Sequence, residues 1–247
     1  MSGSFAWRDD LMRSAKPVAR FRGVIFDMDG VLCDSEPFIC EAACRMFRER
    51  YGLAVLPEDF VPFVGAGENR YLSGVAEKYG IRLDLESDKR RTYEIYLELI
   101  RGRLRPLAGV HEFLDRCRAL GMKLAVATSA DQVKMRGNLQ EIGLRPERFD
   151  VTVNGLEVTH KKPDPEIFLL AIRRLGVSPQ DCLVVEDAPN GVVAASRAGA
   201  ACLGLTTSFS AAELRAAGAR WTAPDLAHVP EEVLVQSPAE GEGVRAQ

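Results

Sequence analysis

The 247-residue sequence predicts an α/β protein whose doubly wound, Rossmann-like parallel sheet carries a small inserted helical domain. Two observations predict this class. From residue 105 onward, short apolar runs typical of strands alternate with amphipathic stretches typical of helices, a pattern that gives parallel strands joined by right-handed crossovers. Residues 37–104, in contrast, show helical patterns with no convincing strand. We therefore expect residues 21–36 and 105–235 to form the core, and residues 37–104 to form the insertion.

The expected elements follow from hydrophobic patterning along the chain. The run "VIF" at 24–26 is uninterrupted by polar residues, as in a strand buried on both faces. Later strands are expected in "KLAVATS", "FDVTV", "CLVVED" and "ACLGLTT". Core helices are expected in "GVHEFLDRCRALG", "DQVKMRGNLQEIG", "DPEIFLLAIRRLG" and "NGVVAASRAG", and insertion helices in "FICEAACRMFRERYG", "YLSGVAEKYG" and "SDKRRTYEIYLELIRG".

Composition narrows the class of partner. The formal net charge is −3, and no apolar run approaches the length of a membrane span, so neither nucleic acid nor a membrane is the expected partner. The six cysteines show no metal-ligand spacing, which favours reduced thiols in a cytoplasmic protein. We expect a monomer with an N-terminal extension over residues 1–20 and a disordered tail over residues 236–247.

Acidic residues crowd the end of the first expected strand. In "GVIFDMDGVLCDSE", Asp27 and Asp29 follow the apolar run directly, and Asp34 and Glu36 come soon after. Carboxylates a few ångströms apart repel one another, and burial raises their pKa values. Gly30 allows the chain to turn sharply out of the strand. A bound cation is the explanation we favour for this crowding.

Two further strands end in polar residues. "KLAVATS" ends in Thr128 and Ser129, and "CLVVED" ends in Glu186 and Asp187. Because open parallel sheets bind ligands beyond the carboxyl ends of their strands, we expect these side chains to meet Asp27 at one edge. Carboxylate oxygens suit Mg²⁺, which commonly bridges to a substrate phosphate. The sequence therefore predicts a site for Mg²⁺ and a phosphoryl group.

The residue types at this edge indicate phosphoryl transfer through a covalent intermediate. Asp27 would attack phosphorus to form an aspartyl-phosphate, and Asp29 would protonate the leaving group and then activate water. Lys162, which follows Lys161 in "THKKPDPEIF", would bind the phosphoryl oxygens together with the Thr128 hydroxyl. Taken singly, such acids and hydroxyls commonly cap helices, and a Lys-Pro pair is typical of turns. Their combination favours a catalytic site.

These segments resemble the haloacid dehalogenase superfamily of phosphohydrolases. "FDMDGVLCDSE", "VATSA", "KKPDPEIF" and "VVEDAPNGVVAASRAG" are similar to its first to fourth motifs, in the family's order. The resemblance covers about residues 21 to 235, and the helical block resembles the cap of the β-phosphoglucomutase-like branch. It implies a Mg²⁺ cofactor and a helical cap over residues 37–104.

The resemblance also implies a role for each matching residue. Asp27 is the implied nucleophile, and Asp29 is the implied acid/base whose backbone carbonyl also binds Mg²⁺. The implied phosphate-binding residues are Thr128, Ser129 and Lys162. The implied metal ligands are Asp27, Asp29, Glu186 and Asp187. Dehalogenases proper lack the second aspartate of D-x-D, so Asp29 argues against dehalogenation.

The cap departs from the mutases of this branch at two positions. Ile39 stands where those mutases resemble one another in a histidine, and Glu68 stands where they carry a basic residue for the distal phosphate. The loop residues Gly67, Glu68, Asn69 and Arg70 are interpreted as a substrate-specificity loop. The alternative is that Asn69 or Glu68 only caps a helix starting near Tyr71.

The leading hypothesis is a Mg²⁺-dependent phosphatase that hydrolyses a small phosphorylated metabolite, such as a sugar phosphate, through an aspartyl-phosphate. A β-phosphoglucomutase-type phosphomutase and an inorganic pyrophosphatase remain alternatives within the enzymes. A phospho-accepting signalling receiver uses similar strand-end acids, but it is disfavoured by Asp29 and by the cap. A non-catalytic binding module is disfavoured because the catalytic residue set is complete.

Overall fold

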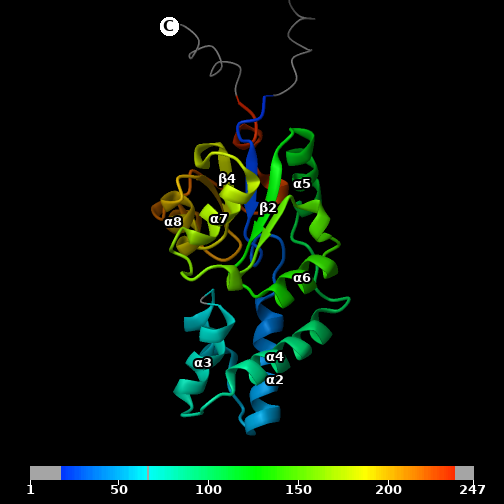
Figure 1. Ribbon diagram of the computed structural model, residues 1–247, viewed down its shortest axis with the longest axis vertical. Helices are drawn as coiled ribbons and strands as arrows, with labels where there is room; N and C mark the ends of the chain where they lie inside the picture. Colours follow the sequence, from blue (N-terminus) through cyan, green and yellow to red (C-terminus); the bar gives the residue numbers. More distant parts are fainter. Residues whose placement is uncertain (1–17, 66, 237–247) are drawn as a thin grey trace, which may run out of the picture.

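Figure 1 shows the computed structural model of the protein, which describes residues 18–65 and 67–236. The core sheet occupies one end of the elongated molecule, and a group of helices occupies the other. Most of the expected N-terminal extension and disordered tail lies outside the described residues. Within the described ranges, no helix is both long and apolar enough to cross a membrane.

The core is a six-stranded sheet in the order β3-β2-β1-β4-β5-β6, and every pair of neighbouring strands is parallel. The predicted doubly wound α/β class is confirmed, because the strand order reverses between β1 and β4. The strands are β1 (Gly23–Phe26), β2 (Lys123–Ala127), β3 (Val151–Val153), β4 (Cys182–Glu186), β5 (Ala201–Leu205) and β6 (Trp221–Ala223).

Helices cover both faces of this sheet, with α5 and α6 on one side and α7 and α8 on the other (Figure 1). The core helices are α5 (Val110–Ala119), α6 (Gln132–Glu141), α7 (Glu166–Leu175), α8 (Pro189–Arg197) and α9 (Ala211–Ala216). Side chains of a strand alternate between faces, so Val24 and Phe26 join one buried cluster while Ile25 joins the other. This double burial explains why β1 is apolar at successive positions.

The second group of helices consists of α2 (Glu36–Tyr51), α3 (Glu68–Lys78) and α4 (Leu85–Ile100). Its two connections to the core run side by side. Cys33 pairs with Pro106 in an antiparallel bridge, and the Leu107 N–H donates to the Leu32 carbonyl at 3.0 Å. We call this helical group the cap; it is joined to the core through two hydrogen-bonded linkers.

The sequence patterns missed two elements near the end of the core. Helix α9 has six residues, too few to display a clear periodicity. Strand β6 has three residues, as the predicted β3 does, but it ends directly before Pro224, which is typical of a turn. Helix α3 begins at Glu68 rather than near Tyr71, and its N-cap is Gly67. Because Gly67 carries no side chain, no Asn or Glu side chain occupies the N-cap position of α3.

Candidate active site

Three neighbouring strands bring the expected site residues to one edge of the sheet. Asp27 directly follows β1, and its N–H donates to the Val185 carbonyl of β4 at 3.0 Å. Thr128 directly follows β2, and Glu186 is the last residue of β4. Since β1 lies between β2 and β4, all three residues lie at the carboxyl edge, where the strand order reverses.

Asp27, Glu186 and Asp187 form a buried cluster of carboxylates. Each offers one oxygen within 4.8 Å of the others. The Lys162 ammonium donates to Asp27 Oδ1 at 2.6 Å and to Glu186 Oε1 at 2.5 Å. One ammonium therefore contacts two of the three carboxylates and cannot neutralise the whole cluster.

The pKa values in the cluster reflect this shortage of positive charge. Burial raises the pKa of Asp27 to about 7, against the lowering effect of Lys162. Burial, together with Glu186 and Asp27, raises the pKa of Asp187 to about 8. Burial alone would lower the pKa of Lys162, but Asp27 and Glu186 raise it above its ordinary value. The cluster is therefore short of positive charge.

Two glycines make room for this cluster. Gly30 has φ of +73°, and a Cβ there would lie 1.9 Å from Asp187 Oδ2. A Cβ on Gly191 of α8 would lie 1.9 Å from Glu186 Oε1. The carboxylates thus pack directly against backbone, and their oxygens are the ligand type that Mg²⁺ prefers. The residues present fit a small divalent cation.

The Asp29 carboxylate lies outside this cluster. Its Oδ1 accepts a hydrogen bond from the Ser35 hydroxyl, and its Oδ2 accepts one from the Lys134 ammonium at 2.9 Å. Lys134, on α6, is buried with 5% of its side chain exposed. The two aspartates of the D-x-D segment therefore face different partners.

The segment after β2 leaves a hydroxyl proton available. Thr128 is buried, and its Oγ1 accepts from the Ala130 N–H at 3.1 Å. Within residues 18–65 and 67–236 the Thr128 hydroxyl hydrogen has no acceptor, so it can donate to an anion. The backbone carbonyl of Ser129 packs against Gly155, where a Cβ would approach it to 2.1 Å. Thr128 and Ser129 thus lie on the neighbouring strand end beside Asp27.

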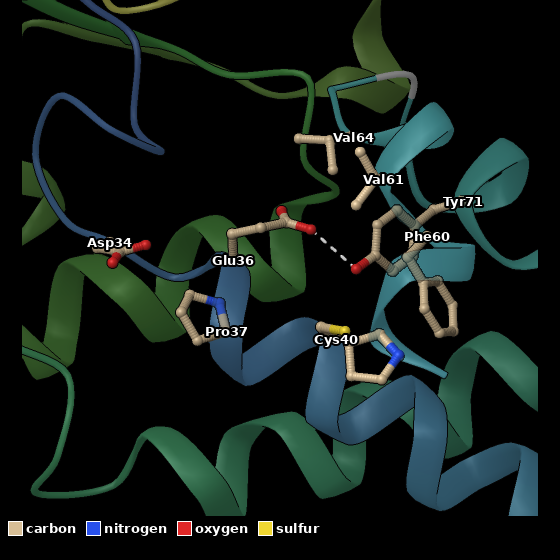
Figure 2. A pocket seen from close by; sticks show the side chains of 9 residues that line it. Asp34, Glu36, Pro37, Cys40, Phe60, Val61, Val64 and Tyr71 are labelled. Atoms are coloured by element: carbon tan, nitrogen blue, oxygen red, sulfur yellow. Dashed lines mark hydrogen bonds between the residues drawn. The ribbon is translucent and has the colours of Figure 1, made fainter. Parts of the chain in front are cut away.

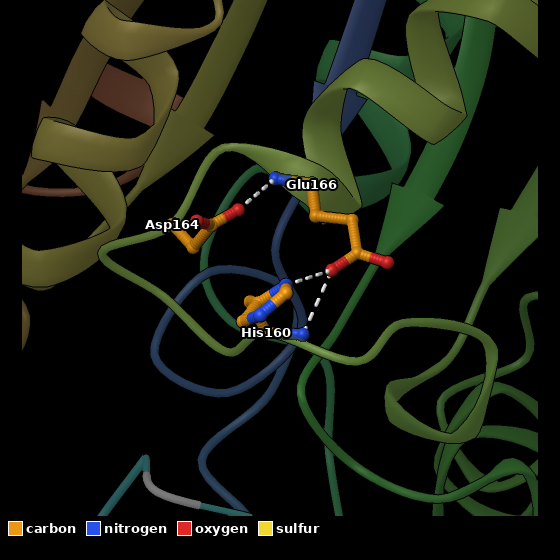
Figure 3. A group of neighbouring side chains, drawn as sticks. All are labelled: His160, Asp164 and Glu166. Carbon is orange, nitrogen blue, oxygen red and sulfur yellow. Dashed lines mark hydrogen bonds and ion pairs between the residues drawn. The ribbon is translucent and has the colours of Figure 1, made fainter.

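Three polar residues brace the loop that carries Lys162 (Figure 3). The Glu166 carboxylate accepts from the backbone N–H groups of Thr159 and His160 at 3.0 and 2.7 Å, and it contacts His160 Nδ1 at 3.0 Å. Asp164 accepts from the Glu166 N–H at 2.9 Å. Although His160, Asp164 and Glu166 are close enough to share an ion, these hydrogen bonds already give them a structural role.

Some residues of the expected specificity loop lie at the interface between the cap and the core, and others lie at the surface. A Cβ on Gly67 would lie 3.5 Å from Lys161 Cε and 3.8 Å from the Ser129 carbonyl, so this cap residue lies against the core. Glu68 is buried and faces Lys134. Arg70 instead donates to Glu77 along the exposed side of α3, and Asn69 is exposed. The structure thus brings Gly67 and Glu68 to the interface, but neither Asn69 nor Arg70.

A family model and two curated proteins are similar to this chain. A model of haloacid dehalogenase-like hydrolases matches residues 21–199. The chain is 40% identical over 212 residues to Protein SUPPRESSOR OF QUENCHING 1, chloroplastic, of Arabidopsis thaliana; the match covers 83% of this chain and 20% of that protein. It is 39% identical over 176 residues to Phosphorylated carbohydrates phosphatase of Thermotoga maritima, covering 71% of this chain and 81% of that protein.

A solved structure is similar to this chain in both fold and sequence. A Thermotoga maritima protein assigned as a β-phosphoglucomutase has a TM-score of 0.68 and 36% identity, over 83% of this chain and 95% of that chain. The chain spans about a fifth of the chloroplast relative but most of the two bacterial ones. The chain therefore belongs to the haloacid dehalogenase-like hydrolases, in the branch that includes phosphatases and β-phosphoglucomutase-like proteins.

Proposed function

We propose that the protein is a Mg²⁺-dependent phosphatase that hydrolyses a small phosphorylated metabolite, of which a sugar phosphate is the leading candidate. The observation that carries this proposal is the separation of the two aspartates. Asp27 lies in the carboxylate cluster beside Lys162, whereas the Asp29 carboxylate lies outside it. The phosphatase relative from Thermotoga maritima supports a carbohydrate phosphate as substrate.

Asp27, Glu186 and Asp187 would hold the metal ion, with the backbone carbonyl of Asp29 as a further ligand. When bound, Mg²⁺ supplies positive charge that lets an anionic nucleophile approach an anionic phosphoryl group. The Lys162 ammonium and the Thr128 hydroxyl would bind the phosphoryl oxygens, where charge is redistributed in the transition state.

The first chemical step would form an aspartyl-phosphate. A carboxylate oxygen of Asp27 attacks phosphorus, and the bond from phosphorus to the alcohol oxygen breaks. Asp29, which would be protonated in the substrate complex, donates its proton to that oxygen. In the second step Asp29 accepts a proton from water while the water oxygen attacks phosphorus. Inorganic phosphate leaves, and both aspartates return to their starting states.

Asp29 must exchange its present contacts to perform this role. Both carboxylate oxygens accept hydrogen bonds, from Ser35 and Lys134. The ester oxygen of the substrate would take the place of one of these two donors, and the Asp29 oxygen that faces it would carry the proton to be transferred. Since Ser35 and Lys134 come from the first linker and from α6, a small shift of either segment would release Asp29.

A substrate screen with metal control tests the proposal. Protein treated with a chelator is assayed for phosphate release from sugar phosphates, nucleotides, short acyl phosphates and pyrophosphate, with and without added Mg²⁺. We expect Mg²⁺-dependent release from at least one phosphomonoester. Cleavage of pyrophosphate alone would support a pyrophosphatase instead. Isomerisation of a sugar phosphate without net phosphate release would support a mutase.

A further inference from the structure

We propose that the enzyme selects phosphomonoesters whose alcohol carries no negative charge; this inference rests on the proposed function and specifies its substrate class. The argument comes from the charges at the face that the cap presents to the core. The core motifs contact only the phosphoryl group and the metal, so discrimination between alcohols depends on the cap and the linkers.

Glu68 places a buried carboxylate at this interface. Its side chain is 9% exposed, and its Oε1 lies 4.0 Å from the Lys134 ammonium. Glu68 Oε2 and the Tyr93 hydroxyl are both fully buried. Burial, followed by the charges and hydrogen bonds of Glu68 and Asp131, raises the pKa of Tyr93, so its hydroxyl faces both acids. Glu68 therefore acts on a bound alcohol through its charge and not through a direct contact.

The cations near Glu68 already have partners. Lys134 lies 2.9 Å from Asp29, closer than it lies to Glu68. Lys89 of α4 pairs with Asp131 at 2.8 Å. Lys161, beneath Gly67, donates to the Gly155 carbonyl. Lys134 and Lys89 are thus paired with carboxylates, whereas Lys161 donates to a neutral carbonyl. The acids Asp29, Glu68, Asp131, Glu36 and Asp34 outnumber these three lysines.

A pocket of about 250 Å³ adjoins this region, at the start of α2 (Figure 2). Its lining contains the acids Asp34 and Glu36 but no basic residue, and its walls include Phe60, Val61 and Val64. Ser35, which donates to Asp29, lies between the lining residues Asp34 and Glu36, so the pocket lies close to the proposed acid/base. The pocket therefore offers a bound alcohol an apolar wall with acidic side chains beside it.

The consequence is electrostatic selection against anionic alcohols. A carboxylate or second phosphate bound here would face Glu36 and Asp34, with Glu68 about one turn before the lining residue Tyr71 on α3. Repulsion by one such charge at about 8 Å, with an effective dielectric constant of about 20 to 30, corresponds to at least about tenfold in kcat/KM. A neutral or cationic alcohol of similar size avoids this cost.

Three phosphomonoesters of similar size differ mainly in the charge of the alcohol. Ethylene glycol monophosphate has a neutral alcohol, phosphoethanolamine an ammonium, and phosphoglycolate a carboxylate. With Mg²⁺, we expect kcat/KM for the first two to exceed that for phosphoglycolate by about tenfold or more. Glu68→Gln should raise the ratio of phosphoglycolate to ethylene glycol monophosphate activity by about tenfold.

Glu77→Gln is the matched control. It removes the same charge from the same helix, but Glu77 is exposed and lies nine residues further on, about 13 Å along the axis. The activity ratio of this variant should equal that of the wild type.

Equal kcat/KM values for phosphoglycolate and ethylene glycol monophosphate in the wild type would overturn the inference, whether or not the variants fold. An equal ratio in Glu68→Gln and Glu77→Gln would overturn the role of Glu68. If Mg²⁺ supports no phosphate release from any phosphomonoester, the proposed function fails and this inference fails with it.

Discussion

The contacts of Lys162 explain much of the active-site arrangement at the scale of single residues. Its ammonium lies within 2.6 Å of both Asp27 and Glu186, so it holds together two carboxylates that would otherwise repel. Asp187 does not share this contact, and burial raises its pKa to about 8. A divalent cation would supply the missing positive charge for all three acids.

Asp29→Asn should separate the two chemical steps. With p-nitrophenyl phosphate the leaving group needs no protonation, so the phospho-enzyme should form but break down slowly. Rapid quenching followed by mass spectrometry of the Asp27 peptide would measure its accumulation. Absence of any phosphorylated peptide, under conditions where the variant binds Mg²⁺, would contradict the role of Asp29.

Gly191→Ala should weaken metal binding through steric displacement of Glu186. Because the added Cβ would lie 1.9 Å from Glu186 Oε1, the carboxylate must move. Isothermal titration should show a Mg²⁺ dissociation constant raised by about tenfold, the factor that corresponds to a lost contact of about 1.4 kcal/mol. Ser196→Ala, at an exposed position of the same helix, is the control. Equal Mg²⁺ affinity in both variants would show that Glu186 tolerates the displacement.

The sequence could predict Asp27 and Glu186 together, because the carboxyl ends of parallel strands share one edge. It could not predict Lys134. A lysine in an amphipathic helix usually faces solvent, and nothing in "DQVKMRGNLQEIG" indicates that Lys134 and Asn138 face inward. The burial of Lys134 depends on Asp29 and Glu68, which come from other parts of the chain.

At the scale of elements, long periodic patterns predicted the helices well, because an apolar stripe recurs over several turns in α2 and α4. Short elements depend on tertiary contacts instead. Strand β6 has three residues and is fixed by pairing with β5, which no local pattern reveals. The early start of α3 at Glu68 likewise depends on the contact of the Gly67 loop with the core.

Asp59 should stabilise the cap in a pH-dependent way. It accepts hydrogen bonds from the Leu56 N–H at 2.9 Å and the Tyr79 hydroxyl at 2.6 Å, and it pairs with Lys78. The hydrogen bonds from Lys78, Tyr79 and Leu56 lower the pKa of Asp59 to about 2. Its contribution is therefore present above the unfolded-state pKa of about 3.9, and is lost as pH falls towards 2.

Asp59→Asn should accordingly reduce the free energy of unfolding by about 1–3 kcal/mol at pH 7. The difference from wild type should shrink between pH 5 and pH 3, as measured by urea titration. Asp84→Asn is the comparison: it removes the charge of an exposed N-cap residue that accepts from the Ser87 N–H at 3.4 Å, and it leaves an acceptor oxygen in place. A difference that stays constant over this pH range would contradict the assignment.

At the scale of the whole molecule, the proposed active site lies where the core and the cap meet. The core contributes the carboxylate cluster and Lys162, and the cap contributes Glu68, which faces Lys134, the partner of the proposed acid/base Asp29. The order of the motifs in the sequence predicted the core because strand order fixes which loops become neighbours. It did not reveal which side of α3 faces the core, so Glu68 and Arg70 were equally plausible candidates for the interface.

The measurement that tests the central claim most directly is covalent capture at Asp27. Wild-type protein, Mg²⁺ and a hydrolysed phosphomonoester are mixed, quenched in acid within the first turnover, and analysed by peptide mass spectrometry. We predict one phosphoryl group on the peptide containing Asp27. We also predict that Asp27→Asn lacks it and loses at least about a thousandfold in kcat, because an amide is a poor nucleophile. An Asp27→Asn variant that keeps more than about a tenth of the wild-type kcat would contradict covalent catalysis at this residue.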